Sequence, residues 1–313
     1  MLVRIADSLY WMARYIERAN SITRLIKINY TAALDYSQVE KINWSNILSL
    51  TVDLNPDEIQ HNQLHYSRIV SHILTSKDNV NSVYNVISYA RNNARTAQDQ
   101  ITREIWRSIN DLYLFISSSK VNRYIVKNEI LELIDELTQH ITSYYGNLKI
   151  TMPRNESYSY INLGNYVERA LQTIKLFNNK YSEIGFNLEA HNDILFWKHL
   201  LLSVSGYEFF LKNSSQELNT IDVANMILFN DAFPHSLIYS IKSIHHEFEK
   251  LHFHNNKQES ENLYFNIGKM HSQLLYTRIQ NLSPDDFKKL CQDLAQETNN
   301  IVLDYQHHYL NYI

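Results

Sequence analysis

Tyr15-Ile16-Glu17-Arg18-Ala19, near the start of the chain, returns with one change as Tyr166-Val167-Glu168-Arg169-Ala170 just past its middle. The two phrases lie about half a chain length apart. Repetition at such a distance predicts two related helical units, each with an acid followed by a base at the same point of its first helix. The two Glu-Arg pairs are therefore the first place to look for function.

Apolar residues recur around both phrases at steps of three and four, which is the spacing of one face of a helix. Around the first phrase they are Leu2, Ile5, Leu9, Met12, Ile16, Ala19 and Ile26; around the second they are Tyr160, Leu163, Val167, Ala170, Ile174 and Phe177. Each glutamate also follows a small residue, Ala13 or Gly164, by one turn, where a neighbouring helix can approach closely. We therefore expect long amphipathic helices with partly buried carboxylates.

The chain is poor in turn residues, with 5 glycines and 4 prolines among 313 residues, against usual shares of about 7% and about 5%. Ser283-Pro284 is typical of a helix start, with a serine cap and proline in the first helical position. No segment shows the alternation of a strand. The sequence predicts an all-α fold without a significant sheet: one domain over residues 1–313, a helical bundle built from two related repeats at about 1–150 and 151–313.

Charge and cysteine content exclude several classes of protein. A net charge of −4 and the lack of a basic run argue against a nucleic-acid binder. Residues 194–211 are the most apolar stretch, but Lys198 and Glu208 interrupt it, so no membrane span is expected. Cys291 is the single cysteine, which excludes an intramolecular disulfide. We expect a cytoplasmic protein without a cofactor or bound metal.

Arg14 and Arg18 lie one turn apart on the first predicted helix, in a row with Asp7 and Trp11. Such a row is either a binding surface or an ordinary solvated face. Glu17 lies beside it and, if buried, needs a hydrogen-bonding partner. Arg14 and Arg24 are candidates on the same helix, and a structural ion pair that fixes the helix register is the alternative to a functional site.

A further helix is predicted over about residues 80–117, where alanines at 90, 94 and 97 continue an apolar ladder and indicate tight packing. Arg91 and Arg95 share one of its faces. Two guanidinium groups at this spacing can hold a carboxylate or phosphate by paired hydrogen bonds. Alternatively, they neutralise Glu17 or Glu168 across the bundle.

A metal site is a further hypothesis. Glu58 with His61 and Glu249 with His252 have the Glu-x-x-His spacing of di-iron bundles, in which Glu17 and Glu168 would be the remaining ligands. The abundance of glutamate and histidine, however, gives about one such pair by chance. The motif is therefore weak, and no metal ligand is assigned.

Residues 6–19 closely resemble the opening of the bacterial alpha-E domain family, and the resemblance continues through 90–95, 163–170 and 233–236. It implies an all-α protein of the kind usually encoded beside a circularly permuted ATP-grasp protein, which resembles peptide ligases, and a transglutaminase-like protease. The chain departs from the family pattern at Asn20, Gln98, Leu171, Lys175 and His235. Because these changes remove charge from the second half especially, the first-half site is favoured.

The resemblance favours a non-catalytic role: an accessory or partner-binding protein that acts with an ATP-grasp-type peptide or amide ligase and binds an anionic peptide or amino-acid group. The candidate site is a Glu/Arg cluster of Glu17, Arg18, Arg14, Arg91, Asn93, Arg95, Glu104, Glu168 and Arg169. One alternative is a stand-alone helical enzyme with Glu17 and Glu168 as acid/base or metal-binding carboxylates. Another is a purely structural scaffold.

Overall fold

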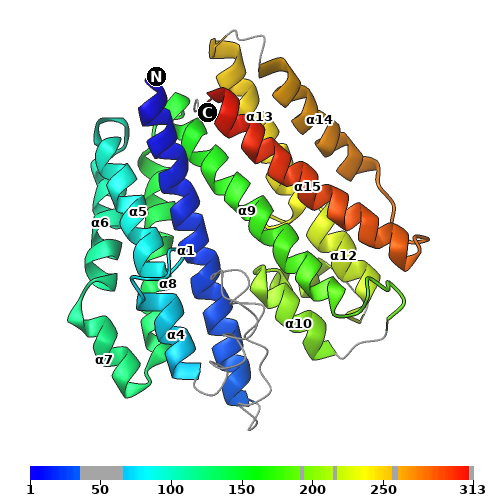
Figure 1. The fold of residues 1–313 in the computed structure, drawn as a ribbon, viewed down its shortest axis with the longest axis horizontal. Helices are drawn as coiled ribbons and strands as arrows, with labels where there is room; N and C mark the ends of the chain where they lie inside the picture. Colours follow the sequence, from blue (N-terminus) through cyan, green and yellow to red (C-terminus); the bar gives the residue numbers. More distant parts are fainter. Residues whose placement is uncertain (36–65, 191–193, 214–216, 256–259, 310–313) are drawn as a thin grey trace. The chain divides into compact units, whose positions relative to one another are not determined.

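The computed structural model describes residues 1–35, 66–190, 194–213, 217–255 and 260–309, which form helices joined by short turns, with no strand among them (Figure 1). The predicted all-α class is therefore confirmed. The chain folds as two compact units: an N-terminal unit, Ser8–Ile161, and a C-terminal unit, Met1–Asp7 with Asn162–Ile313. Whether the two halves are repeats of one ancestral unit, within a single domain, stays a prediction.

In the N-terminal unit, successive helices pack side by side around α6. The elements are α1 (Val3–Asp35, whose first turn belongs to the other unit), α4 (Tyr66–Thr75), α5 (Val83–Thr96), the 3-10 turn η2 (Gln98–Gln100), α6 (Arg103–Ile116), α7 (Ser119–Lys127) and α8 (Ile130–Thr151). Helix α6 packs against both α5 and α8, while α4 lies on α5 and α7 on α8. A ring contact between Tyr15 and Tyr89, with centroids 5.3 Å apart, places α1 beside α5.

The single helix expected over residues 80–117 is wrong, because the chain breaks between α5 and α6. Ile101 has an extended backbone, and the Thr102 hydroxyl accepts a hydrogen bond from the Ile105 amide to begin α6. A side-chain cap of this kind competes with continuation of the helix. Ala97 and Ile105 are nevertheless buried on either side of the break, since both helices cover the same core.

The C-terminal unit contains the rest of the helices. They are α9 (Glu156–Ser182, from Asn162 onward in this unit), α10 (Ile194–Ser203), α11 (Tyr207–Asn213), α12 (Thr220–Phe229), α13 (Leu237–Asn255), α14 (Ser260–Tyr276) and α15 (Pro284–Tyr309). Helix α14 packs against α12, α13 and α15. The predicted start of α15 is confirmed: Pro284 is its first residue, and the Ser283 hydroxyl accepts a hydrogen bond from the Asp286 amide at 3.2 Å.

The apolar faces predicted for the two Glu-Arg helices are largely confirmed. On α1 the stripe from Leu9 to Ile26 is buried, whereas Leu2 is exposed at the end of the chain. On α9 the whole predicted stripe from Tyr160 to Phe177 is buried. Burial of such a stripe is the main source of stability for a long helix. The spacing of apolar residues thus predicted correctly which face of each helix is buried.

Aromatic rings fill the core of the C-terminal unit at the far end of α9. Phe177 and Tyr181 stack with centroids 4.1 Å apart, and Trp197 and Phe287 pack against Tyr181 at 5.2 and 5.7 Å. The Tyr181 hydroxyl donates to the Thr220 carbonyl at 2.7 Å. The cluster therefore joins α9, α10, α12 and α15 through one buried tyrosine.

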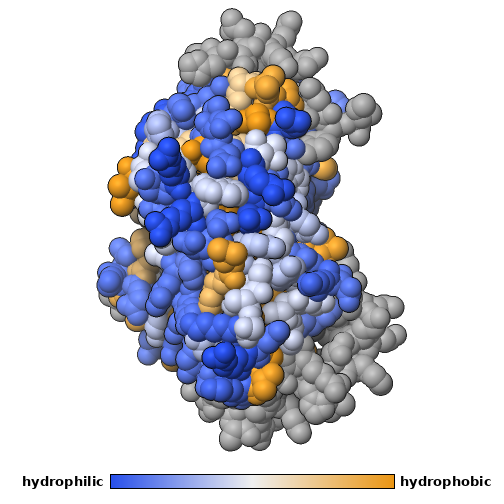
Figure 2. Space-filling model, turned by 90° about the vertical axis from the view of Figure 1, so that its left-hand side faces the viewer, coloured by the Kyte–Doolittle hydropathy of each residue, from blue (hydrophilic) through white to orange (hydrophobic). Residues whose placement is uncertain are grey.

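The face seen in Figure 2 is mostly hydrophilic, and its apolar residues form small separate patches. Scattered apolar side chains are usual on a water-exposed surface. None of the helices in the described ranges is both long and apolar enough to cross a membrane. That finding agrees with the interruption of residues 194–211 by charged side chains.

Two histidines at the contact between α13 and α14 should make the stability of the protein depend on pH. His245 stacks on Tyr264 at 4.7 Å and lies 6.4 Å from the His271 ring. Burial lowers the pKa of His245, opposed by Glu249 and aided by His246; burial, His245 and Lys242 lower the pKa of His271, opposed by Asp231. The folded protein thus binds a proton at either histidine less tightly than the unfolded chain does, in which the histidine pKa is near 6.5.

Above the unfolded-state pKa both histidines are neutral, and burying them costs nothing in protonation. As the pH falls below that pKa, the unfolded chain binds protons more readily than the folded protein, and the stability decreases. We expect the urea midpoint to drop between about pH 7.5 and about pH 5.5. His245→Phe, which keeps a ring in the stack, should reduce the drop, whereas His307→Phe on the exposed surface of α15 should not. An identical drop in wild type and His245→Phe would contradict this assignment.

Candidate functional site

Glu17 lies on the buried side of α1, with 1% of its surface exposed. The Tyr145 hydroxyl, on α8, donates a short hydrogen bond to Glu17 Oε2. The neighbouring Tyr144 is fully buried, and its burial, followed by the charge of Glu17, raises the pKa of its hydroxyl. Glu17 therefore ties α1 to α8 and is more deeply buried than its small neighbour Ala13 alone indicated.

The arginines of α1 lie against aromatic rings. The Arg14 guanidinium is 4.4 Å from the Trp11 ring centroid, and the residue as a whole is 5% exposed. Arg18 lies over Tyr15 and donates from Nη1 to Asn81 Oδ1 at 3.0 Å. Asn81 immediately precedes Ser82, the cap of α5. Arg18 therefore connects α1 to the turn from which α5 begins.

Arg91 is held in place on α5 by two groups of α6. Its Nε donates to Asn110 Oδ1 at 2.8 Å, and its guanidinium lies 4.5 Å from the Tyr113 ring centroid. Within the described residues, neither of its Nη groups has a hydrogen-bond acceptor or an ion-pair partner. Arg95, one turn further along α5, is exposed and likewise has none there.

Asn93 on α5 and Glu104 on α6 are the other predicted members of the cluster on these two helices. Each side chain interacts with its own helix. The Asn93 side chain donates to the Tyr89 carbonyl at 2.9 Å, one turn back on α5. Glu104 is exposed in the first turn of α6, where a carboxylate interacts favourably with the helix dipole. These contacts account for both residue types without a ligand.

The second Glu-Arg pair lies on α9 in the C-terminal unit. Glu168 is 1% exposed, and its Oε1 accepts a hydrogen bond from Gln172 Nε2 at 3.0 Å. Arg169 donates from Nη1 to the Pro234 carbonyl at 3.3 Å, and Thr173 donates to the His235 carbonyl at 3.2 Å. The helix therefore holds the turn that leads into α13.

Each Glu-Arg pair thus makes a similar local arrangement inside its own unit. The glutamate is buried and accepts a side-chain hydrogen bond, while the arginine binds the turn just before a capped helix. The caps are Ser82, which accepts from the Asn85 amide, and Ser236, which accepts from the Tyr239 amide. In both units the glutamate thus faces the interior and the adjacent arginine reaches a neighbouring turn; that the two halves are repeats stays a prediction.

Sequence reasoning missed the partners Tyr145, Asn81 and Gln172, and it also missed a third buried glutamate. Glu247 on α13 accepts from Asn162 Nδ2 at 3.1 Å and pairs with Lys250 Nζ at 3.1 Å. Its i,i+3 spacing to Lys250 was a usable signal. The partners on other helices had no comparable signal, because their spacing along the chain is long.

Metal and thiol chemistry find little support among the described side chains. No group of three or more histidine, cysteine, aspartate or glutamate residues is placed there to hold a metal ion. Glu58, His61 and the His252 side chain lie outside the described residues. Cys291 is buried, and burial raises the pKa of its thiol to about 12. A thiol held protonated in this way is a poor nucleophile.

The fold and these contacts define an all-α protein in which each of two compact units contains a Glu-Arg pair with a buried glutamate. Residues 1–310 match the model of the Alpha-E family, described as a predicted alpha-helical domain with a conserved ER motif. The chain belongs to the Alpha-E family, and Glu17-Arg18 and Glu168-Arg169 are its two Glu-Arg dipeptides. Comparisons with curated proteins and with solved structures found no match.

Proposed function

We propose that the protein is a non-catalytic, partner-binding component that acts with an ATP-grasp-type peptide or amide ligase. In this proposal, Arg91 and Arg95 bind an anionic group of the ligase or of its peptide substrate. The ligase is inferred from the resemblance to a family usually encoded beside ATP-grasp proteins. The binding residues are inferred from the contacts along α5.

The orientation of Arg91 is the observation that carries the proposal. Asn110 binds Nε, and Tyr113 supports the plane of the guanidinium. A guanidinium fixed along that edge presents its two Nη groups end-on, which is a geometry that chelates a carboxylate. Arg95 adds a second exposed cation one turn away. A pre-oriented donor loses less entropy on binding than a freely rotating one.

Burial of the two Glu-Arg carboxylates favours a structural role for them over a catalytic one. Glu17 and Glu168 are each 1% exposed, and each accepts a hydrogen bond from another side chain. A general acid or base must come within hydrogen-bonding distance of its substrate. The stand-alone enzyme with these two carboxylates in its active site is therefore the weaker hypothesis.

The test is a calorimetric titration of the full-length protein with the ATP-grasp ligase of the same organism. Wild type should form a complex, and Arg91→Ala combined with Arg95→Ala should weaken it by about tenfold or more, because charged hydrogen bonds contribute about 1.5–3 kcal/mol each. Arg123→Ala, which removes an exposed cation from α7, is the matched control and should bind as wild type does.

Circular dichroism should show that the double variant stays folded with the helix content of wild type, at a lower melting temperature because Arg91 loses its contacts with Asn110 and Tyr113. If wild type does not bind the ligase, the proposed partnership is wrong. If the double variant binds with unchanged affinity, the partnership stands but these arginines are not its binding residues.

A further inference from the structure

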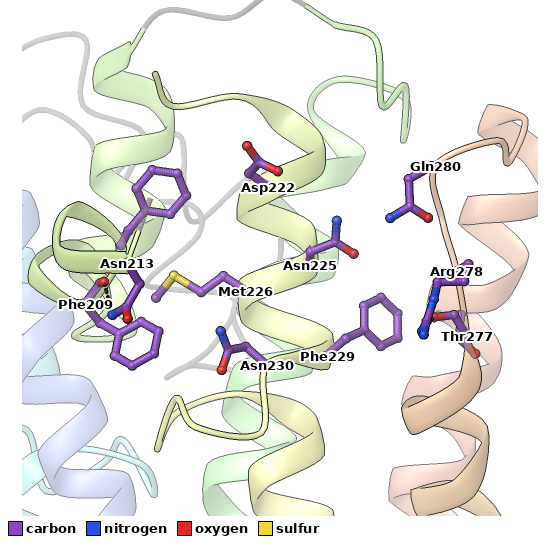
Figure 3. A pocket seen from close by; sticks show the side chains of 11 residues that line it. Phe209, Asn213, Asp222, Asn225, Met226, Phe229, Asn230, Thr277, Arg278 and Gln280 are labelled. Atoms are coloured by element: carbon purple, nitrogen blue, oxygen red, sulfur yellow. Dashed lines mark hydrogen bonds between the residues drawn. The ribbon is translucent and has the colours of Figure 1, made fainter. Parts of the chain in front are cut away.

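A cavity of about 590 Å³ opens in the C-terminal unit, bordered by α11, α12 and the turn from α14 to α15 (Figure 3). It is lined by Phe209, Phe210, Asn213, Asp222, Asn225, Met226, Phe229, Asn230, Thr277, Arg278 and Gln280. Most of these side chains are polar. The cavity lies in a different unit from Arg91 and Arg95, so it is a separate site.

Two carboxamides face each other across the cavity. Asn225 projects from α12 and Gln280 from the α14–α15 turn, each toward the other (Figure 3). Neither side chain has a hydrogen-bond partner within the described part of the chain. By contrast, Asn213 donates to the Phe209 carbonyl and Asn230 accepts from the Ala232 amide. Asn225 and Gln280 therefore keep both donors and acceptors available for a ligand.

The guanidinium group of Arg278 also lines the cavity. Arg278 donates from Nη1 to the Thr277 carbonyl at 3.0 Å and to the Leu275 carbonyl at 3.4 Å. These bonds anchor one end of the group, and its Nε and Nη2 have no acceptor among the described residues. Asp222, the single acidic residue of the lining, has a partner already, since Asn219 donates to its Oδ2 at 2.6 Å. Asp222 keeps its negative charge, and Arg278 is the one cation of the lining and thus its anion-binding group.

We propose that this cavity binds the carboxyl-terminal end of an extended peptide. A carboxamide both donates and accepts, so it matches a peptide group. Carboxamides on opposite walls match an extended main chain, because its N–H and C=O groups point alternately to its two edges. The free edge of Arg278 binds the terminal carboxylate, and Phe229, which extends toward Arg278 (Figure 3), contacts a side chain.

A neutral sugar would also use the carboxamides and the phenylalanine rings, but it would leave the anchored guanidinium without an anion. Arg278 therefore favours the peptide carboxylate as the ligand. The inference goes beyond the proposed function, because it requires neither the ligase nor the arginines of α5. Its test depends only on whether a peptide binds in this cavity.

Methionine-methyl NMR of the full-length chain provides the test, since Met226 lines the cavity and the chain has 5 methionines. The probe is tetra-alanine with a free carboxyl terminus, compared with its carboxyl-terminal amide and with maltose. Tetra-alanine should shift the Met226 signal saturably. Met12 and Met152, which are buried in the N-terminal unit, should stay in place.

The amide should bind about tenfold more weakly than the free acid, because it lacks the charge that Arg278 pairs with. Arg278→Gln should remove that difference, and Arg123→Gln should retain it. No shift of Met226 up to about 20 mM tetra-alanine, equal binding of acid and amide, or a response to maltose alone would each overturn the proposal. A response to maltose alone would identify a carbohydrate site instead.

Discussion

Replacing Glu17 with alanine is expected to lower the free energy of unfolding by about 3 kcal/mol. The change removes a buried carboxylate, leaves the Tyr145 hydroxyl without its acceptor, and opens a small cavity between α1 and α8. Alanine is the best helix former, so the loss reports the tertiary contact. Urea unfolding followed by circular dichroism measures it.

Glu104→Ala is the matched control, because this glutamate is exposed on α6 and its removal should cost at most about 1 kcal/mol. If Glu17→Ala were no more destabilising than Glu104→Ala, the carboxylate would not be a structural member of the core. Glu17 would then have to be considered again as a functional group.

Replacing Tyr181 with alanine is expected to destabilise the C-terminal unit by about 3–5 kcal/mol, the range for large aromatic residues in a core. Tyr181 is fully buried and contacts the rings of Phe177, Trp197 and Phe287. Tyr181→Phe keeps the packing but leaves the Thr220 carbonyl without its donor, for an expected loss of about 1–3 kcal/mol.

Tyr276→Ala is the surface control, since 76% of this tyrosine on α14 is exposed, and it should change stability by less than about 0.5 kcal/mol. The loss should therefore decrease from Tyr181→Ala to Tyr181→Phe to Tyr276→Ala, because packing and hydrogen bonding both contribute at the buried position. A Tyr181→Phe variant as unstable as Tyr181→Ala would show that the hydroxyl, and not the ring packing, dominates there.

Features governed by local spacing could be predicted from the sequence. The apolar stripes of α1 and α9 follow from steps of three and four, and the start of α15 follows from the serine cap and proline at 283–284. The small residue one turn before Glu17 and before Glu168 predicted partial burial of each carboxylate, and both are buried more deeply than that, at 1% exposure. These properties depend on the chain near the residue itself.

The break between α5 and α6 shows where periodicity misleads. The apolar ladder continues through it because both helices cover one core, so the pattern cannot distinguish one helix from two. Thr102 was the deciding residue, since its hydroxyl caps α6. A search for caps inside an apparently continuous helix would have found it.

Partners from distant helices could not be predicted. Tyr145 is one of 22 tyrosines, and only the packing of α8 against α1 selects it for Glu17. The cavity beside Arg278 is equally hidden, because its walls come from α11, α12 and the α14–α15 turn. Such sites depend on tertiary structure and leave no short motif.

The most direct test of the claim that Glu17 is a structural carboxylate is its coupling free energy with Tyr145. A double-mutant cycle of Glu17→Gln and Tyr145→Phe isolates that term in the free energy of unfolding. We predict a coupling of about 1.5–3 kcal/mol, as expected for a hydrogen bond to a charged group. Strictly additive losses, with a coupling below about 0.5 kcal/mol, would contradict the account.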